Sequence, residues 1–308
     1  MPLHIETPLL HSAPLSQLTR KQVWLKMEAM QPSGSFKMRG IGAVCEGYAR
    51  AGKRRLISSS GGNAGIAAAH AGRLLGLAVT VVVPQSATVR ARELIAEQGA
   101  EVMVHGATWH EAHALAQSML DEYSAFVHPF DDPVAWQGHA TLVDEVVAAG
   151  VDFDAVVLTV GGGGLLCGVV AGLRHHGLTQ LPVVAVETLG ADSLHQSVQA
   201  GQRVELPSIT SIATTLGARQ VCAQAFELTR VHPIITAVVD DAQAVQACFD
   251  FMRDHNTLIE PACGAGLVML YGQNPALQRF ERPLIVVCGG STATWPQLQR
   301  WREELPAS

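Results

Sequence analysis

The sequence predicts an α/β protein built on open, mostly parallel sheets that are covered by helices on both faces. Short runs rich in Val, Ile and Leu alternate with segments of helical period, which is the pattern of a parallel sheet. The run AVVLTV at 155–160 is apolar on both faces, as strands in the middle of such a sheet are. With 308 residues, 48% of them hydrophobic, the chain is long enough for two domains or one large α/β unit.

The individual elements follow this alternation along the chain. A strand-like run at 23–28 (VWLKME) comes first, and three strand–helix pairs then occupy 54–76, 77–99 and 100–123. Gly76 and Gly99 stand where the first two of these helices should end, because glycine readily adopts the left-handed backbone of a helix C-cap. A second series begins near Pro133, with further segments at 154–177, 181–201, 240–255, 260–272 and 284–290.

Composition argues against several classes of protein. A net charge of −6 gives no basic surface for nucleic acid, and no apolar run is long enough to span a membrane. The N-terminus lacks the basic and apolar regions of a secretion signal. Six cysteines show neither CxxC pairs nor zinc-ligand spacing, so we expect free thiols and a reducing, cytoplasmic location.

Three glycine-rich junctions, at 58–65, 159–168 and 286–292, each follow an apolar strand. Ligands of open α/β sheets bind at this end of the strands. Four successive glycines at 161–164 leave backbone N–H groups free at the start of a helix near Leu165, which suits a phosphate. The run matches neither nucleotide-binding fingerprint well. The alternative is a tight turn with close packing between helix and strand.

Each remaining feature also has two interpretations. The junction SSSGGNAG can hold a carboxylate, or it can be a helix with favourable caps. Cys288 can be a small buried apolar residue, or its thiol can form a hydrogen bond with a ring nitrogen. Lys37, in QPSGSFKMRG, can be a solvated loop lysine or a reactive amine.

Taken together, the lysine, the phosphate cradle, the carboxylate cradle and the neutral thiol favour pyridoxal 5′-phosphate as cofactor. Its aldehyde forms a Schiff base with a lysine, and its phosphate and ring nitrogen both need partners. The amino acids on which it acts carry a carboxylate.

The chain closely resembles the fold-type II pyridoxal-phosphate enzymes, and among them the short, catabolic L-serine/L-threonine dehydratases. The resemblance runs over nearly the whole chain and includes LKMEAMQPSGSFKMRGIGA, SSSGGNAGIAAA, PFDDPVAWQGHATLVDE, VGGGGLLCGVVAGL, EPACGAG and VVCGGS. It implies two open twisted sheets, a large cofactor-binding domain formed by 1–33 and 134–308, a smaller mobile domain at 34–133, and a homodimer.

The resemblance also implies roles for individual residues. Lys37 corresponds to the catalytic lysine that carries the cofactor. The other cofactor contacts implied are Phe36, Asn63, Gly161, Gly162, Gly163, Gly164, Leu165 and Cys288. The substrate contacts implied are Ser60, Gly61, Gly62 and Asn63. A monovalent cation, K⁺, is implied at Glu187, Ala191, Ser193 and Leu216.

The implied reaction is β-elimination from L-serine to pyruvate and ammonia, and from L-threonine to 2-oxobutanoate. Gly61 departs from the related serine racemases, which have at this position a serine that serves the second face of the substrate. This departure favours elimination over racemization. Two alternatives remain: a β-replacement enzyme similar to cysteine synthase or threonine synthase, and a catalytically silent amino-acid sensor.

Overall fold

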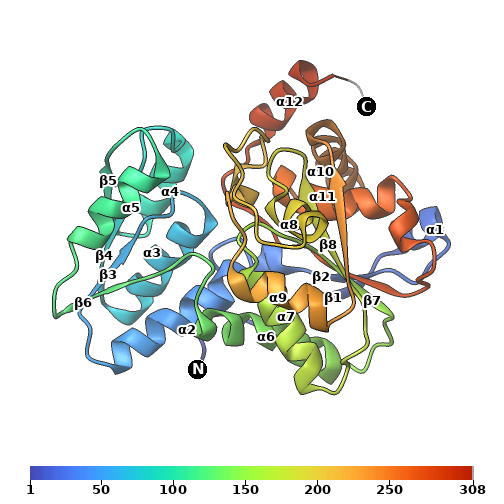
Figure 1. The fold of residues 1–308 in the computed structure, drawn as a ribbon, viewed down its shortest axis with the longest axis horizontal. Coiled ribbons are helices and arrows are strands. Elements are labelled where there is room, and N and C mark those ends of the chain that lie inside the picture. Colours follow the sequence, from blue (N-terminus) through green and yellow to red (C-terminus); the bar gives the residue numbers. More distant parts are fainter. Residues whose placement is uncertain (307–308) are drawn as a thin grey trace.

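The computed structural model describes residues 1–306 and contains two open sheets flanked by helices (Figure 1). The six-stranded sheet has the order β1-β2-β10-β7-β8-β9, and the four-stranded sheet has the order β5-β4-β3-β6. All neighbouring strands are parallel except β1 and β2, which are antiparallel. The predicted α/β class, with two mostly parallel sheets, is confirmed.

The strands have the following bounds: β1 Leu9–His11, β2 Trp24–Lys26, β3 Arg55–Ser58, β4 Ala78–Val83, β5 Glu101–Val104, β6 Ser124–Phe126, β7 Ala155–Thr159, β8 Val183–Thr188, β9 Ile234–Val239 and β10 Pro283–Val286. The α-helices are α1 Ala13–Thr19, α2 Lys37–Arg50, α3 Asn63–Leu75, α4 Val89–Glu97, α5 Trp109–Ser118, α6 Pro133–Ala148, α7 Gly164–His175, α8 Ser193–Ala200, α9 Ala223–Val231, α10 Asp241–His255, α11 Pro261–Tyr271 and α12 Trp295–Glu304. Short 3₁₀ helices are η1 Glu28–Met30, η2 Thr214–Leu216 and η3 Pro275–Leu277.

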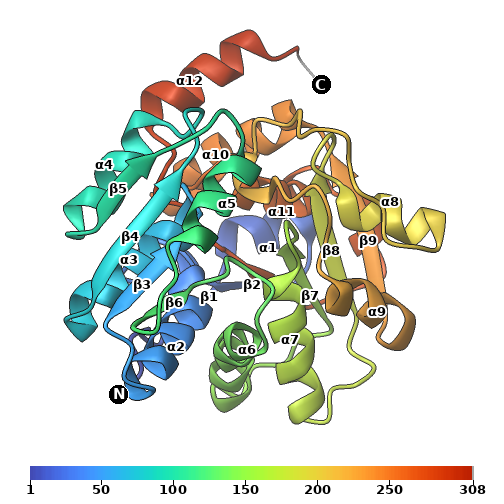
Figure 2. The same cartoon turned by 60° about the vertical axis from the view of Figure 1, so that its left-hand side comes forward.

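A strand from near the start of the chain pairs with a strand from near its end in the six-stranded sheet. Strand β2, from the first 30 residues, pairs with β10, the last strand, so that Leu25 lies opposite Ile285. The four-stranded sheet uses only the segment 55–126, and Figures 1 and 2 show it with α3, α4 and α5 beside the larger sheet. This connectivity agrees with an inserted unit, and the limits 34 and 133 stay a prediction.

Each sheet has its own apolar core. The larger core surrounds the six-stranded sheet, where β7, β8 and β10 are buried along their whole length. Helix α11 packs against β7 and β8 and is buried at all residues from 261 to 270, which explains why its sequence is apolar on every face. A second core, of residues from α2, α3 and β4, lies beside the four-stranded sheet.

A buried ionic network holds the start of α2. Arg39 is fully buried and donates to both oxygens of Glu28, at 2.7 and 2.8 Å, and to both oxygens of Glu145, at 2.6 and 2.7 Å. Lys26 in β2 also pairs with Glu145. Because the network links β2, α2 and α6, it fixes the backbone two residues away from Lys37.

Candidate active site

Lys37 is the first residue of α2, and its amino group points into the protein. The Nζ atom donates to the carbonyl oxygen of Pro129 at 2.6 Å and lies 5.1 Å from the centroid of the Phe36 ring. Removal of the ammonium from water lowers the pKa of Lys37 to about 8, although the neighbouring Cys288 acts in the opposite direction. A neutral amine is therefore accessible near physiological pH, which an exposed loop lysine does not offer.

The backbone beside Lys37 is joined to the end of β10. The N–H of Phe36 donates to the carbonyl oxygen of Cys288 at 3.1 Å, and Ser35 forms an antiparallel bridge with Gly289. The Cys288 thiol is buried and lies 3.5 Å from the hydroxyl of Thr159, at the end of β7. The structure thus brings the predicted lysine and the predicted thiol to the same edge of the large sheet.

The glycine run offers free backbone donors. Gly163 has φ +94° and forms the N-cap of α7, so the helix begins at Gly164, one residue before the predicted start. Within the described part of the chain, nothing accepts a hydrogen bond from the backbone N–H groups of 161–166. Consecutive free N–H groups at the positive end of a helix fit an anionic phosphate.

Close packing also requires these glycines. A Cβ atom on Gly162 would lie 2.2 Å from the Phe130 ring, and one on Gly164 would lie 2.7 Å from the carbonyl oxygen of Phe130. A Cβ atom on Gly161 would lie 3.0 Å from the Cα of Leu216. The packing and phosphate interpretations are therefore compatible, and Phe130 is a neighbour that the sequence did not reveal.

The junction at 58–65 faces the same region. Asn63 begins α3, and its side-chain oxygen accepts from the N–H of Ser291 at 3.2 Å. A Cβ atom on Gly62 would lie 3.6 Å from Thr215, in η2 beside the glycine run. The hydroxyl of Ser60 accepts from the N–H of Gly62 at 3.4 Å. The three glycine-rich junctions thus meet around one site.

Gly61 lies slightly apart from these contacts. A Cβ atom there would point toward Ala87 and Val83, at 3.1 and 3.3 Å. These distances are just below an ordinary van der Waals contact, so a side chain at this position requires small shifts of its neighbours.

The comparisons with known proteins agree with this site. The sequence pattern of the family described as "Pyridoxal-phosphate dependent enzyme" matches residues 1–289. The chain belongs to this family. It is 43% identical over 317 residues to the human "L-serine dehydratase/L-threonine deaminase", covering 99% of this chain and 96% of the human protein. It is 44% identical over 316 residues to the human "Serine dehydratase-like" protein, with 99% and 95% covered. Among solved structures, the fungal L-serine ammonia-lyase from Rhizomucor miehei has a TM-score of 0.93 at 33% identity, with 99% of each chain covered.

The family establishes pyridoxal phosphate as cofactor, and the residues present fit it. An inward-pointing, partly buried amine, a row of free N–H groups and a buried thiol occupy one region, as its aldehyde, phosphate and ring nitrogen require. The roles of the individual residues stay predictions.

His139 is a neighbour of the site that the sequence did not single out. The centroid of its ring lies 5.0 Å from that of Phe36, and both its nitrogens are buried without a partner among the described residues.

The residues predicted to bind a cation include a buried carboxylate, that of Glu187. Glu187, at the end of β8, is buried and accepts the N–H groups of Leu194 and His195 at 2.8 and 2.7 Å. Burial raises its pKa to about 8. The buried hydroxyl of Ser193 has no hydrogen-bond partner within residues 1–306. Ala191 precedes this turn, and Leu216 lies against Gly161. The cation site stays a prediction. A carboxylate and an orphan hydroxyl suit a cation.

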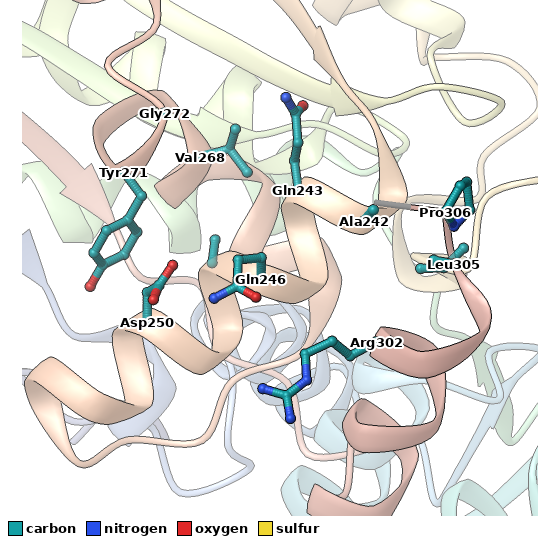
Figure 3. A pocket seen from close by; sticks show the side chains of 11 residues that line it. Ala242, Gln243, Gln246, Asp250, Val268, Tyr271, Gly272, Arg302, Leu305 and Pro306 are labelled. Atoms are coloured by element: carbon teal, nitrogen blue, oxygen red, sulfur yellow. The ribbon is translucent and has the colours of Figure 1, made fainter. Parts of the chain in front are cut away.

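A pocket elsewhere in the molecule contains none of the predicted site residues. It has a volume of about 440 Å³ and lies between α10, α11 and the end of α12 (Figure 3). Asp250, Tyr271 and Arg302 contribute polar atoms to its wall. The predicted site residues therefore lie outside this cavity.

Among the described residues, no helix is both long and apolar enough to cross a membrane.

Proposed function

We propose that this protein is a pyridoxal-phosphate-dependent L-serine ammonia-lyase that also accepts L-threonine, in amino-acid catabolism. The observation that carries the proposal is the amine of Lys37, which donates to the carbonyl oxygen of Pro129 and has its pKa lowered to about 8, beside Cys288 and the free N–H groups of the glycine run. The names of the full-length relatives support the reaction and the two substrates.

The cofactor, when bound, makes the Cα proton of an amino acid acidic by withdrawing electrons from the Cα carbon. The neutral amine of Lys37 is then the base that removes this proton, since a general base works best with a pKa near the operating pH. The hydroxyl group leaves from Cβ with a proton, as water, which balances the proton that Lys37 takes from Cα. Addition of water to the resulting enamine then gives the oxo acid and ammonia.

The remaining residues of the site bind and orient the cofactor and the substrate. The N–H groups of 161–165 hold the phosphate, and Cys288 provides a neutral hydrogen-bonding group for the ring nitrogen. Phe36 lies against the ring, and Asn63 donates to its oxygen substituent. Ser60, Gly61 and Gly62, with the free N–H groups at the start of α3, bind the carboxylate of the substrate. The free N–H groups at this helix start support that assignment.

The assembly, the location and the cation are part of the same proposal. We infer a cytoplasmic homodimer that binds K⁺ at Glu187, Ala191 and Ser193, with Leu216 as a backbone neighbour. The six free, buried cysteines support a reducing compartment. Light scattering of the purified protein tests the dimer.

The test of the activity is a product assay with L-serine and L-threonine, without added sulfide or other nucleophile. We expect pyruvate and 2-oxobutanoate, and an absorbance band at about 410–420 nm from protein-bound pyridoxal. A β-replacement enzyme would give no pyruvate under these conditions. A silent sensor would bind the amino acids without any turnover.

Lys37→Ala should abolish both products, because the covalent anchor and the base are lost together. Lys53→Ala is the matched control, since Lys53 donates to the carbonyl oxygen of Glu122 far from the site. Retention of more than about a hundredth of the activity in Lys37→Ala would contradict the assignment, because loss of a general base alone costs about 10²–10⁴-fold.

A further inference from the structure

Glu260 is a buried carboxylate without a cationic partner. It stands at the N-cap of α11 and is 4% exposed, and no described residue forms an ion pair with it. Its oxygens accept three hydrogen bonds, from Asn63 Nδ2 at 2.8 Å, Thr215 Oγ1 at 2.6 Å and Thr292 Oγ1 at 3.1 Å. Burial of a carboxylate without a cationic partner costs free energy of folding, so its presence at this position calls for a specific reason.

The three donors come from separate parts of the fold, and all lie at the site. Asn63 begins α3 next to the four-stranded sheet, Thr215 belongs to η2 beside the glycine run, and Thr292 follows β10 and Cys288. The backbone wraps closely around the carboxylate, because a Cβ atom on Gly290, whose φ is +137°, would lie 2.0 Å from Glu260 Cδ. Glu260 therefore joins the two sheet units across the site.

These contacts fix the orientation of the Asn63 amide. Its oxygen accepts from the N–H of Ser291, and its nitrogen donates one hydrogen to Glu260 Oε1. A flipped amide would place its oxygen against the carboxylate and its nitrogen against the N–H of Ser291, so both contacts would become repulsive. Burial raises the pKa of Glu260, but Oε1 accepts from Asn63 in either protonation state, because a proton on Oε2 can face Thr292.

One hydrogen of the Asn63 amide remains available. An amide nitrogen has two donors, and the described residues use only the one that faces Glu260. We propose that Glu260 is a positioning residue, which aims this second N–H of Asn63 at the oxygen substituent of the cofactor ring. The proposal rests on the proposed function, in which Asn63 contacts the cofactor.

The experiment is a double-mutant cycle on cofactor affinity. Apo protein is titrated with pyridoxal phosphate for the parent, Glu260→Leu, Asn63→Ala and the double variant, and the visible spectrum is recorded for each. Leucine has a similar volume but accepts no hydrogen bond. If Glu260 acts through Asn63, Glu260→Leu should weaken cofactor binding about tenfold, the equivalent of one charge-assisted hydrogen bond. The same substitution should have less than about a threefold effect once Asn63 is alanine, because coupled sites are not additive.

Glu260→Gln is the rescue variant. Its oxygen can accept from Asn63 and Thr215 while its nitrogen donates to Thr292, so the affinity should stay within about threefold of the parent. Circular dichroism checks folding, and Glu260→Ala replaces the leucine variant in the cycle if leucine does not fit. If Glu260→Leu and Asn63→Ala have additive effects, or if the glutamine variant is as weak as leucine, the proposal is wrong.

Failure of the proposed function gives a different result. In that case the parent itself would not bind the cofactor or would not convert serine. A parent that binds and turns over, with an additive cycle, would overturn only the role of Glu260.

Discussion

The glycine run can be tested with a single methyl group. A Cβ atom on Gly162 would lie 2.2, 2.3 and 2.4 Å from three carbons of the Phe130 ring. Ordinary carbon contacts are about 3.5–4.0 Å, so in Gly162→Ala the ring or the loop must move by more than about 1 Å. The φ of Gly162 is not in the left-handed region, so the effect is steric and involves no backbone strain.

The loop is expected to yield, because the backbone of Phe130 is held in place. Its carbonyl oxygen accepts from the indole nitrogen of Trp136 at 2.7 Å, and its N–H donates to His128 at 3.3 Å. Overpacking of this kind costs about 1–3 kcal/mol. If that cost falls on the cofactor-bound loop, the dissociation constant of pyridoxal phosphate rises about 5- to 150-fold.

The assay is a fluorescence titration of apo protein with the cofactor, and circular dichroism should be almost unchanged. Gly47→Ala is the matched control, since a Cβ atom there meets nothing within 4 Å. In the background of Phe130→Ala, the penalty of Gly162→Ala should fall below about threefold, because the obstructing ring is gone. An unchanged affinity of Gly162→Ala would show that the phosphate binds elsewhere. An equal penalty in both backgrounds would show that the ring is not the obstacle.

Three further outcomes are expected. Arg39→Met leaves Glu28 and Glu145 without their shared cation, which should cost about 3–5 kcal/mol and lower the melting temperature by at least about 6 °C. The pKa of Glu187 is about 8 in the folded state and about 4.3 ordinarily, so between these pH values the folded state binds more protons than the unfolded state. Without K⁺, the free energy of unfolding should therefore fall as pH rises from about 4.3 to about 8. K⁺ should therefore raise the melting temperature more at about pH 9 than at about pH 6. If K⁺ raises the melting temperature of Glu187→Gln as much as that of the parent protein, the cation does not bind at Glu187. Chiral analysis should find negligible D-serine from the parent protein and at most a trace from Gly61→Ser, whose activity should be lower because its Cβ crowds Ala87.

Much of the fold was predictable because it depends on local sequence. Gly76 and Gly99 were predicted to end helices, and both have left-handed backbone, with φ of +67° and +84°. Strand β7, predicted from its apolar faces to lie in the middle of a sheet, stands between β10 and β8 and is fully buried. By contrast, β1 and β6 were not predicted, since each has three residues and too little pattern to be recognised. Strand β9 was also missed, at an edge of the sheet where its residues are only partly buried.

The site was predictable where its chemistry is carried by short motifs. The glycine run and Cys288 follow the ends of β7 and β10, and parallel strands bring their carboxyl ends to one edge of a sheet, where the segment before Lys37 is joined to the residues after β10. Phe130 and Glu260 gave no comparable signal, because their significance depends on what faces them. Glu260 contacts Asn63 across 197 positions of sequence, a pairing that no local pattern specifies.

The sequence by itself determined the α/β class and the places of the glycine-rich junctions, since these follow from side-chain type and the spacing of neighbouring residues, whereas it marked Lys37 as a candidate reactive amine only through the family resemblance. Only the tertiary structure decided how those groups behave. The pKa of Lys37 falls to about 8 because the surrounding chain removes its amine from water, and the pKa of Glu187 rises for the same reason. The orientation of Asn63 is set by a carboxylate from the far end of the chain. Desolvation and long-range hydrogen bonds exist only after distant segments have packed together, and for that reason they cannot be derived from any single stretch of the sequence.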